Sequence, residues 1–183
     1  DIVVLPTATD LVGLECVCVV QGNVSVVNNR ALTNLVGLSG LRMVWGDIIV
    51  ANNRLLSGLD GLGMSQVGGS LEISSNPRLN DLSGLVGLLA IGGDFVLANN
   101  SGLLKVQGLN NLSSVGRDMS IAENDALASL PALDSLSSIA GDLAIGGNDS
   151  LGILSGLKNL TSIGGDLQVA DNNFLQTLEG FSA

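Results

Sequence analysis

Carboxylates are the side chains of this sequence that could carry acid–base or metal chemistry. The chain has no histidine and no tyrosine, which excludes a Ser-His-Asp triad, a Cys-His pair and a histidine-ligated metal site. Aspartates recur at a regular spacing, and Asn23 and Ser70 occupy the two remaining places of the same series. The members of this aspartate column are Asp47, Asp94, Asp118, Asp142 and Asp166.

Stacked carboxylates repel one another, so the aspartate column requires a compensating interaction. One candidate is Ca²⁺, whose sites hold about six to eight oxygen ligands. The other is a set of hydrogen bonds from backbone N–H groups of a glycine-rich bend. We favour the backbone bonds, because Asn and Ser could accept them equally well and one column supplies few metal ligands. We predict no metal site and no cofactor; a metal would be sought at Asp94, Asp118, Asp142 and Asp166.

The same column formally offers the paired carboxylates of a glycoside hydrolase. An active site should interrupt a repeat, however, whereas these residues recur from one repeat to the next. The sequence therefore predicts that the protein is not an enzyme.

Cys16 and Cys18 are the only cysteines. With one residue between them they are poorly placed for an intramolecular bridge, and two thiols are too few for a zinc or iron–sulfur site. We interpret them as two small apolar residues rather than as a redox or metal centre. A disulfide to another chain is the alternative.

The aspartates belong to a motif that occurs seven times and combines Gly, Asp or Asn, alternating apolar residues, Asn and spaced leucines. Successive repeats begin 24, 23, 24, 24, 24 and 24 residues apart. A fixed period of this size predicts a solenoid, in which each coil buries its apolar face only against its neighbours. We number the coils 1 to 7 by their first residues: Gly22, Gly46, Gly69, Gly93, Arg117, Gly141 and Gly165.

Each coil contains a predicted short strand followed by a bend. Apolar residues two and four places after the first residue, such as Val24 and Val26, indicate a strand with one buried face. Later leucines are three residues apart, which favours extended or 3₁₀ pieces between corners over an α-helix. Between these segments stands an invariant asparagine, which predicts an inward ladder bonding the backbone of the bends. This asparagine ladder comprises Asn29, Asn53, Asn76, Asn100, Asn124, Asn148 and Asn172.

These patterns predict an all-β fold, a β-helix or solenoid of about seven 24-residue coils. A single solenoid domain would cover residues 1–183, with an N-terminal cap and partial coil over residues 1–21 and the repeats over residues 22–183. Coil 2 is one residue short, and Met64 and Val67 restore its inward pattern. The last repeat is incomplete, which predicts self-association or a partner at an uncapped C-terminal coil.

The outward positions of the predicted strands form a flat face that carries a single charge, Glu72. Solvated strand faces are usually polar, so a face of small and apolar side chains is a candidate binding surface. Along a rod of about 34 Å it offers an area within the range of ordinary monomer patches. The predicted ligand-binding residues are Ile49, Ala51, Val96, Ala98, Ser120, Ala122, Ala144, Gln168 and Ala170.

Composition narrows the classes of partner. The net charge is −10 with only seven Lys and Arg, which argues against nucleic acid and against anionic membrane surfaces, since both require clustered positive charge. Gly, Ser, Asn or Asp interrupts every apolar run well short of the roughly 18 residues of a membrane span, so direct membrane insertion is not predicted.

The segment Leu160-Thr-Ser-Ile-Gly-Gly-Asp-Leu-Gln-Val-Ala-Asp-Asn-Asn-Phe-Leu175 resembles the receptor L-domain repeat. That family is related to leucine-rich repeats and includes ligand-binding domains of insulin- and EGF-type receptors and many microbial surface proteins. The resemblance covers nearly the whole chain and implies a right-handed β-helix that binds other molecules without catalysis, usually outside the cytoplasm. The chain departs from the family in lacking cysteine-bridged caps and in having few aromatic residues, with Trp45 as the only tryptophan.

The leading functional hypothesis is a non-enzymatic interaction or adhesion module, secreted or on a cell surface, that binds a protein or a glycan through a solenoid face. A structural subunit docked in a larger assembly is the first alternative. The second is an ice-binding protein, which would use the flat face or a second regular ridge of hydroxyl groups. That hydroxyl ridge consists of Ser113, Ser114, Ser137, Ser138, Thr161 and Ser162.

Overall fold

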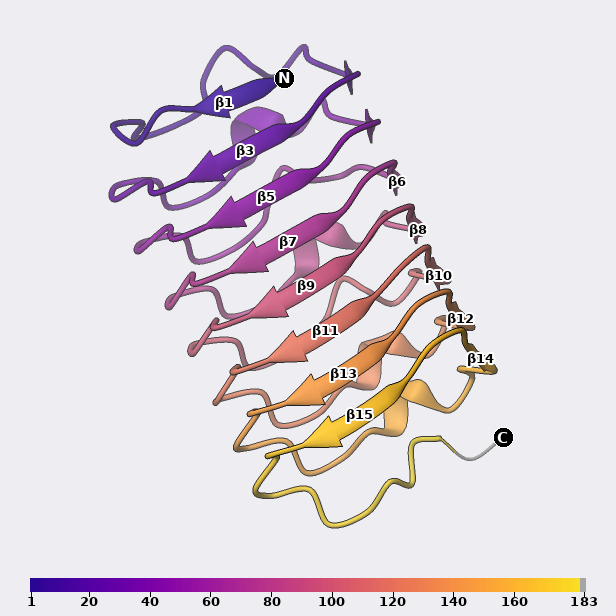
Figure 1. The fold of residues 1–183 in the computed structure, drawn as a ribbon. Helices are drawn as coiled ribbons and strands as arrows, with labels where there is room; N and C mark the ends of the chain where they lie inside the picture. Colours follow the sequence, from indigo (N-terminus) through magenta and orange to yellow (C-terminus); the bar gives the residue numbers. More distant parts are fainter. Residues whose placement is uncertain (182–183) are drawn as a thin grey trace.

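The computed structural model describes residues 1–181, and it shows a stack of parallel-stranded coils with almost no helix. In Figure 1 the front strands run from right to left, the chain returns behind them, and each coil lies below the one before it. The winding is therefore right-handed. The predicted all-β solenoid of about seven 24-residue coils is confirmed.

Eight parallel strands form one sheet, which we call the long sheet. Their register has no slip between complete coils, since Val24 pairs with Ile48 and Met119 with Leu143. One residue type at a given repeat position therefore forms a straight column along the rod. The strands, in spatial order, are β1 (Ile2–Val4), β3 (Val24–Val27), β5 (Ile48–Ala51), β7 (Leu71–Ser74), β9 (Phe95–Ala98), β11 (Met119–Ala122), β13 (Leu143–Gly146) and β15 (Leu167–Ala170).

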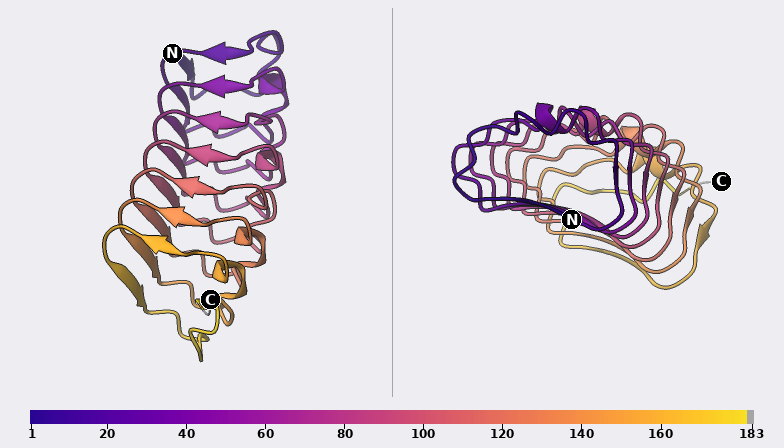
Figure 2. Two further views of the ribbon diagram at one scale, coloured as in Figure 1. Left: turned by 90° about the vertical axis from the view of Figure 1, so that its right-hand side faces the viewer. Right: turned by 90° about the horizontal axis from the view of Figure 1, so that it is seen from above.

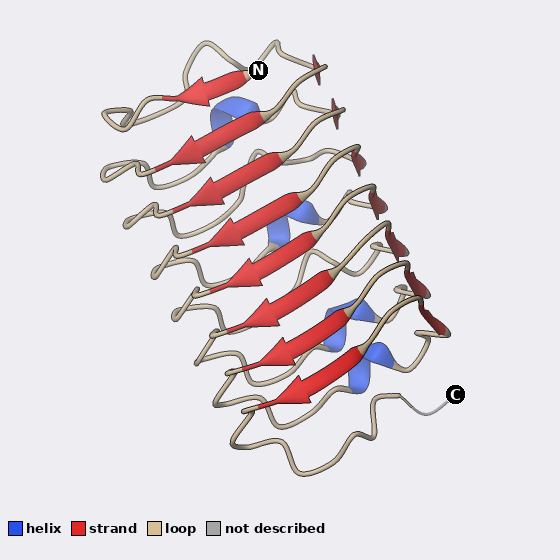
Figure 3. Ribbon diagram, in the orientation of Figure 1, coloured by secondary structure: helices blue, strands red, loops and turns tan. Residues whose placement is uncertain are grey.

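A second parallel sheet of two-residue strands, the short sheet, runs beside the long sheet (Figure 2). Its strands are β2 (Val19–Val20), β4 (Met43–Val44), β6 (Gln66–Val67), β8 (Ala90–Ile91), β10 (Ser114–Val115), β12 (Ser138–Ile139) and β14 (Ser162–Ile163). Four 3₁₀ turns complete the wall on the side away from the long sheet (Figure 3). They are η1 (Val36–Leu38), η2 (Ser83–Leu85), η3 (Pro131–Leu133) and η4 (Ser155–Leu157).

The core is one continuous apolar column inside the coils. Leucines three residues apart, such as Leu32, Leu35 and Leu38, are all buried, as expected for a chain that turns a corner at each step. Met64 and Val67 are also buried, which confirms that they restore the inward pattern of the shortened coil 2.

Residues 1–21 continue the solenoid at its N-terminal end. Strand β1 pairs with β3 through Ile2 and Val24, an offset of 22 residues instead of 24. Val4 and Leu11 are buried against the core. The apolar N-terminal segment thus adds one more strand to the long sheet, which explains why it does not resemble a solvated tail.

Coil 7 is the most exposed coil. Three of its large apolar side chains, Leu167, Phe174 and Leu178, are 46%, 69% and 56% exposed. Ser182 and Ala183, which the incomplete seventh repeat was predicted to include, lie outside the described residues. Self-association at this coil stays a prediction.

Within residues 1–181, no helix has the length and apolar character needed to span a bilayer.

Candidate interaction surface

The asparagine ladder is a structural device inside the wall of the solenoid. Asn29 to Asn148 of the ladder are fully buried and Asn172 is half-buried. At Asn124, Nδ2 donates to the carbonyls of Leu97 (2.9 Å) and Ala122 (3.0 Å). Its Oδ1 accepts from the backbone N–H of Asn100 at 3.1 Å. Each amide therefore links its own bend to the previous coil, and the predicted ladder is confirmed.

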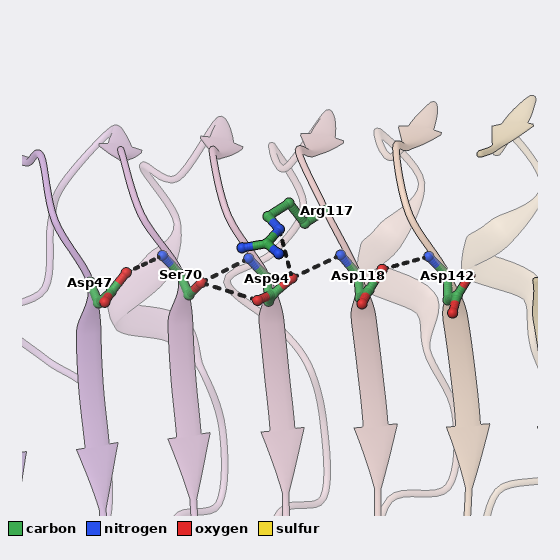
Figure 4. Close-up of polar contacts among 6 residues, drawn as sticks. All are labelled: Asp47, Ser70, Asp94, Arg117, Asp118 and Asp142. Carbon is green, nitrogen blue, oxygen red and sulfur yellow. Dashed lines mark hydrogen bonds and ion pairs between the residues drawn. The ribbon is translucent and has the colours of Figure 1, made fainter. Parts of the chain in front are cut away.

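The aspartate column lies at the start of the long-sheet strands, where each side chain binds the backbone of the following coil (Figure 4). The N–H of Asp118 donates to Asp94 Oδ1 at 3.1 Å, and the N–H of Asp142 donates to Asp118 Oδ1 at 2.8 Å. Asn23 and Ser70 accept equivalent bonds from Asp47 and Asp94. The predicted backbone hydrogen bonds are present, and they account for the mixture of Asp, Asn and Ser at this position.

Two further groups complete the column. Asp1 Oδ1 accepts from the N–H of Asn23 at 2.7 Å, a member that the sequence did not reveal because its spacing is 22 residues. Arg117 lies over the column with Nε 3.7 Å from Asp94 Oδ1, which offsets part of the repulsion between neighbouring carboxylates.

The aspartates and cysteines that could serve metal or redox chemistry do not gather into one site. Among residues 1–181, no three His, Cys, Asp or Glu side chains come close enough to hold one metal ion. Asp94, Asp118, Asp142 and Asp166 follow one another singly along the rod, one per coil. Cys16 and Cys18 are free thiols, and both are exposed.

A second column at the far end of the long-sheet strands has left-handed backbone geometry. Here φ lies between 55° and 65° in every complete coil, a conformation in which Asn, Asp and Gly are enriched. The sequence signal for this column, not used above, is the preference for Asn, Asp and Gly just before the ladder asparagine. This left-handed column comprises Asn28, Asn52, Ser75, Asn99, Glu123, Gly147 and Asp171.

All nine predicted ligand-binding residues lie in the long sheet, at positions that alternate with its inward-facing positions. Most of them are half-buried, and Gln168 is exposed. Ala51 is only 5% exposed and offers a ligand little surface. The face is thus flat and close-packed, which limits how much of each side chain a ligand could contact.

Four of those nine residues come together in one shallow pocket of about 190 Å³. Ile49, Ala51, Val96, Ala98 and Ser120 do not line it. We call this pocket the notch; its lining residues are Ala122, Glu123, Ala144, Ile145, Gly146, Gly147, Gln168, Ala170 and Asp171.

The notch exists because coil 6 has two glycines where other coils have side chains. Gly146 occupies an outward strand position that is Val27 in coil 1 and Ala98 in coil 4. Gly147 is the only glycine of the left-handed column. The Glu123 carboxylate lies over Gly147, in the space that a Cβ there would occupy. The result is a small apolar floor bordered by the carboxylates of Glu123 and Asp171.

Three of the six hydroxyl groups of the ridge bind the backbone. Ser113, Ser137 and Thr161 each donate a hydrogen bond to a carbonyl one coil earlier, over 2.9, 3.1 and 3.1 Å. Hydroxyl groups that donate to the protein keep only acceptor sites for water. Ice binding stays a prediction, which measurement of thermal hysteresis in concentrated protein would test.

Comparisons of the chain with models of known protein families, with curated proteins and with solved structures found no match. The resemblance to receptor L-domain repeats stays a prediction from the residues of the repeat.

Proposed function

We propose that the chain is a non-enzymatic interaction module that binds a protein or a glycan through the outward face of the long sheet, centred on the notch. The proposal places the protein outside the cytoplasm, secreted or on a cell surface, as its likeness to receptor L-domain repeats implies. It requires no metal and no cofactor.

The notch carries this proposal because it departs from the repeat. Residues that recur in every coil are explained by stacking, as the two hydrogen-bonded columns show. Gly146, Gly147 and Glu123 break their columns together and leave a recess in an otherwise flat wall. The stacking of coils alone does not explain such a local interruption of the repeat.

The chemistry of the notch indicates what it could hold. Its floor of Ala122, Ala144 and Ala170 is apolar, and Glu123 and Asp171 place negative charge at opposite sides. A Lys or Arg side chain of a protein would fit, since its methylene stem can cover apolar surface while its charged end reaches a carboxylate. Sugar hydroxyls could use the same carboxylates and the Gln168 amide.

The experiment compares Gly146→Val with Ala98→Val. Both changes add a valine at the same outward strand position, where coil 1 already has Val27, but only the first fills the notch. The labelled parent and both variants would be applied to an array of immobilised glycans and of lysine- and arginine-containing peptides. We expect Gly146→Val to lose about tenfold or more of the parent's binding, and Ala98→Val to retain it.

Two results would contradict the proposal: an array on which the folded parent binds nothing above background, or equal binding by the two variants. Thermal melts of both variants serve as the folding control. A Cβ at residue 146 would lie 3.3 Å from the Ala170 carbonyl oxygen, so a small loss of stability is expected and must be measured.

The alternative function is a structural subunit of a larger assembly. The exposed Leu167, Phe174 and Leu178 of coil 7 favour it, because neighbouring subunits would cover such side chains. Light scattering over a range of concentrations tests it. Self-association that disappears in Phe174→Ser would support this role, whereas a parent that stays monomeric and binds array ligands would count against it.

A further inference from the structure

The charged residues at the far end of the long-sheet strands are ordered by sign along the rod. They directly follow the ladder asparagine, next to the left-handed column, in every coil except coil 3, where Pro77 takes that place and Arg78 comes one residue later. All of them are exposed. Coils 1 and 2 have arginine at that position, coil 3 has Arg78 beside it, coil 4 has serine, and coils 5 and 6 have aspartate. We call this column the corner ridge: Arg30, Arg54, Arg78, Ser101, Asp125, Asp149 and Asn173.

The left-handed column follows the same order. It is neutral in coils 1 to 4, and it contributes Glu123 in coil 5 and Asp171 in coil 7. Positive charge thus gathers at one half of this edge and negative charge at the other, in a protein that has only seven basic residues. An elongated molecule with such an edge has a charge pattern that is complementary to itself.

The arginines of the basic half are not held in ion pairs within residues 1–181. The ion pairs of residues 1–181 involve Arg117 and Lys158, so Arg30, Arg54 and Arg78 form none among the described residues. Arg30 and Arg54 line an open groove of about 740 Å³ together with Pro6, Thr7, Asn28 and Asn52. Two like charges one coil apart, about 4.8 Å, favour an acidic occupant.

A two-fold axis through coil 4 superimposes the complementary halves. It brings coil 1 opposite coil 7 of a second copy, coil 2 opposite coil 6, and coil 3 opposite coil 5. Arg54 then faces the second copy's Asp149, and Ser101 faces the same residue of the other copy. Arg78, one residue beyond the ridge position, lies in the coil opposite Asp125. In this antiparallel arrangement every contact occurs twice, as in any isologous interface.

The same operation aligns a projection with a recess. Arg54 lies opposite coil 6 of the second copy, and coil 6 is where Gly146 and Gly147 open the notch. The carboxylates of Glu123 and Asp171 border that notch on either side, and Asp149 lies beyond it on the ridge. In this register all three arginines lie opposite coils that have an acidic residue at this edge, and Arg54 lies opposite the recess.

We propose that two copies of this chain associate side by side and antiparallel along the corner ridge, with Arg54 of each copy seated in the notch of the other. This inference rests on the proposed binding role of the notch and names its occupant. The methylene stem of Arg54 would pack on the alanine floor, and its guanidinium would form ion pairs with Glu123 and Asp171.

The contact area indicates a weak dimer. A ridge of about 34 Å with one sheet column beside it covers on the order of 500 Å² per copy, below the roughly 800 Å² of a standard interface. Most of the attraction is between exposed charges, which salt screens within about 8 Å at physiological ionic strength. We expect a micromolar to millimolar dissociation constant that rises about tenfold or more between low and high salt.

Charge exchange between two variants tests the register. In Arg54→Asp, residue 54 would face the second copy's Asp149 with like charge, and in Asp149→Arg two arginines would face each other. Each variant alone should therefore dimerise at least about tenfold more weakly than the parent. In an equimolar mixture of the two, residues 54 and 149 carry opposite charges at both contacts, so heterodimers should associate at least about tenfold more tightly than either variant alone. Their affinity should stay below that of the parent, because the aspartate introduced at residue 54 would also face Glu123 and Asp171.

Lys105→Asp is the matched control for this exchange. It makes the same change of charge at an exposed residue away from the ridge, so it should dimerise like the parent. Sedimentation velocity of the intact chain at low and high salt gives the dissociation constants. Circular dichroism melts confirm folding, which is expected because Arg54 is exposed and forms no ion pair among the described residues.

Three outcomes would overturn the inference. They are a parent that is monomeric at millimolar concentration and low salt, a dimer that Arg54→Asp leaves intact, and variant mixtures that fail to restore association. A monomeric parent that binds a sulfated oligosaccharide through Arg54 would assign the basic half of the ridge to an anionic ligand instead.

Failure of this inference is distinguishable from failure of the proposed function. If Gly146→Val abolishes binding to an array ligand while the parent stays monomeric, the notch binds a foreign partner and the dimer is wrong. If the parent binds nothing on the array while the charge-exchanged mixture restores the dimer, the notch serves self-association. The proposal that it binds a foreign ligand is then wrong.

Discussion

The asparagine ladder and the aspartate column place one polar residue per coil along the same rod, yet they differ in how much substitution they show. The ladder position is Asn in all seven coils, whereas the column contains Asp, Asn and Ser. The ladder is buried through coil 6, and the column is exposed or half-buried. Burial is therefore the property that separates an invariant position from a variable one within a single repeat.

The hydrogen bonds explain this difference. A ladder side chain must both donate and accept, because Asn124 donates to Leu97 and Ala122 and accepts from Asn100. Only an amide supplies both functions at this size without charge. A column side chain needs only to accept one N–H, which a carboxylate, an amide or a hydroxyl can do.

The hydrogen bonds of the asparagine ladder and those of the aspartate column also run in opposite directions along the rod. A ladder Oδ1 accepts from the coil before it, whereas a column Oδ1 accepts from the coil after it. Asn29, the first member of the ladder, therefore has no donor for its Oδ1 among the described residues. Asp1 supplies the corresponding first contact of the column.

Asn124→Asp should have the largest effect. The change is nearly isosteric, but it removes the Nδ2 donor and places a carboxylate among the carbonyls of Leu97 and Ala122. We expect a loss of about 3–5 kcal/mol in the free energy of unfolding, as for an uncompensated buried charge. Urea denaturation measures it, and a loss below about 1 kcal/mol would show that burial does not protect this position.

Asn124→Leu should cost less, about 1–3 kcal/mol. Leucine has a similar size and carries no charge, but it removes the hydrogen bonds to the Leu97 and Ala122 carbonyls and leaves the Asn100 N–H without its acceptor. Urea denaturation is again the measurement. A variant that unfolds at the same urea concentration as the parent would contradict the structural role of the ladder.

Asn29→Leu should be milder than the same change at Asn124, at about 1 kcal/mol. It removes bonds from Nδ2 to Val27 and Asn53, and it also removes an Oδ1 that is buried without a partner. Chemical denaturation of the two leucine variants side by side tests the direction of the ladder. Equal losses would show that the first member of the ladder and an interior member are energetically alike.

Asp118→Ala should have the smallest effect of the four, about 0.5–1 kcal/mol, because it removes one acceptor at an exposed site. Asp118→Asn is its matched control. The amide oxygen can still accept from Asp142, and the loss of a like charge in the column offsets any weakening. We expect the Asn variant to lie within about 0.5 kcal/mol of the parent in urea denaturation.

Much of the fold followed from the repeat because stacking imposes one environment on each repeat position. The alternation of Val24 and Val26 indicated a strand, and the recurrence of Asn124 and its equivalents indicated a buried ladder. Positions that break the period were harder to predict. Asp1 and β1 continue the column and the long sheet at an offset of 22 residues, so alignment to a 24-residue period does not find them.

The candidate site was predicted only in part. The outward columns were assigned to one face, but the sequence analysis treated nine residues as equivalent, whereas only Ala122, Ala144, Gln168 and Ala170 share the notch. The two glycines that open the notch, Gly146 and Gly147, have no functional group that would mark them as binding residues in the sequence. The left-handed column and the charge order of the ridge become visible once the residues of successive coils are placed side by side.

The sequence by itself determined the solenoid, its inward residues and its lack of histidine chemistry, because period and side-chain type are local properties that stacking repeats. The tertiary structure alone decided which outward residues lie together, which acceptor has no donor, and where a missing side chain opens a recess. These features depend on contacts between residues about 24 positions apart. Such contacts are defined by the register of neighbouring coils and not by any one repeat.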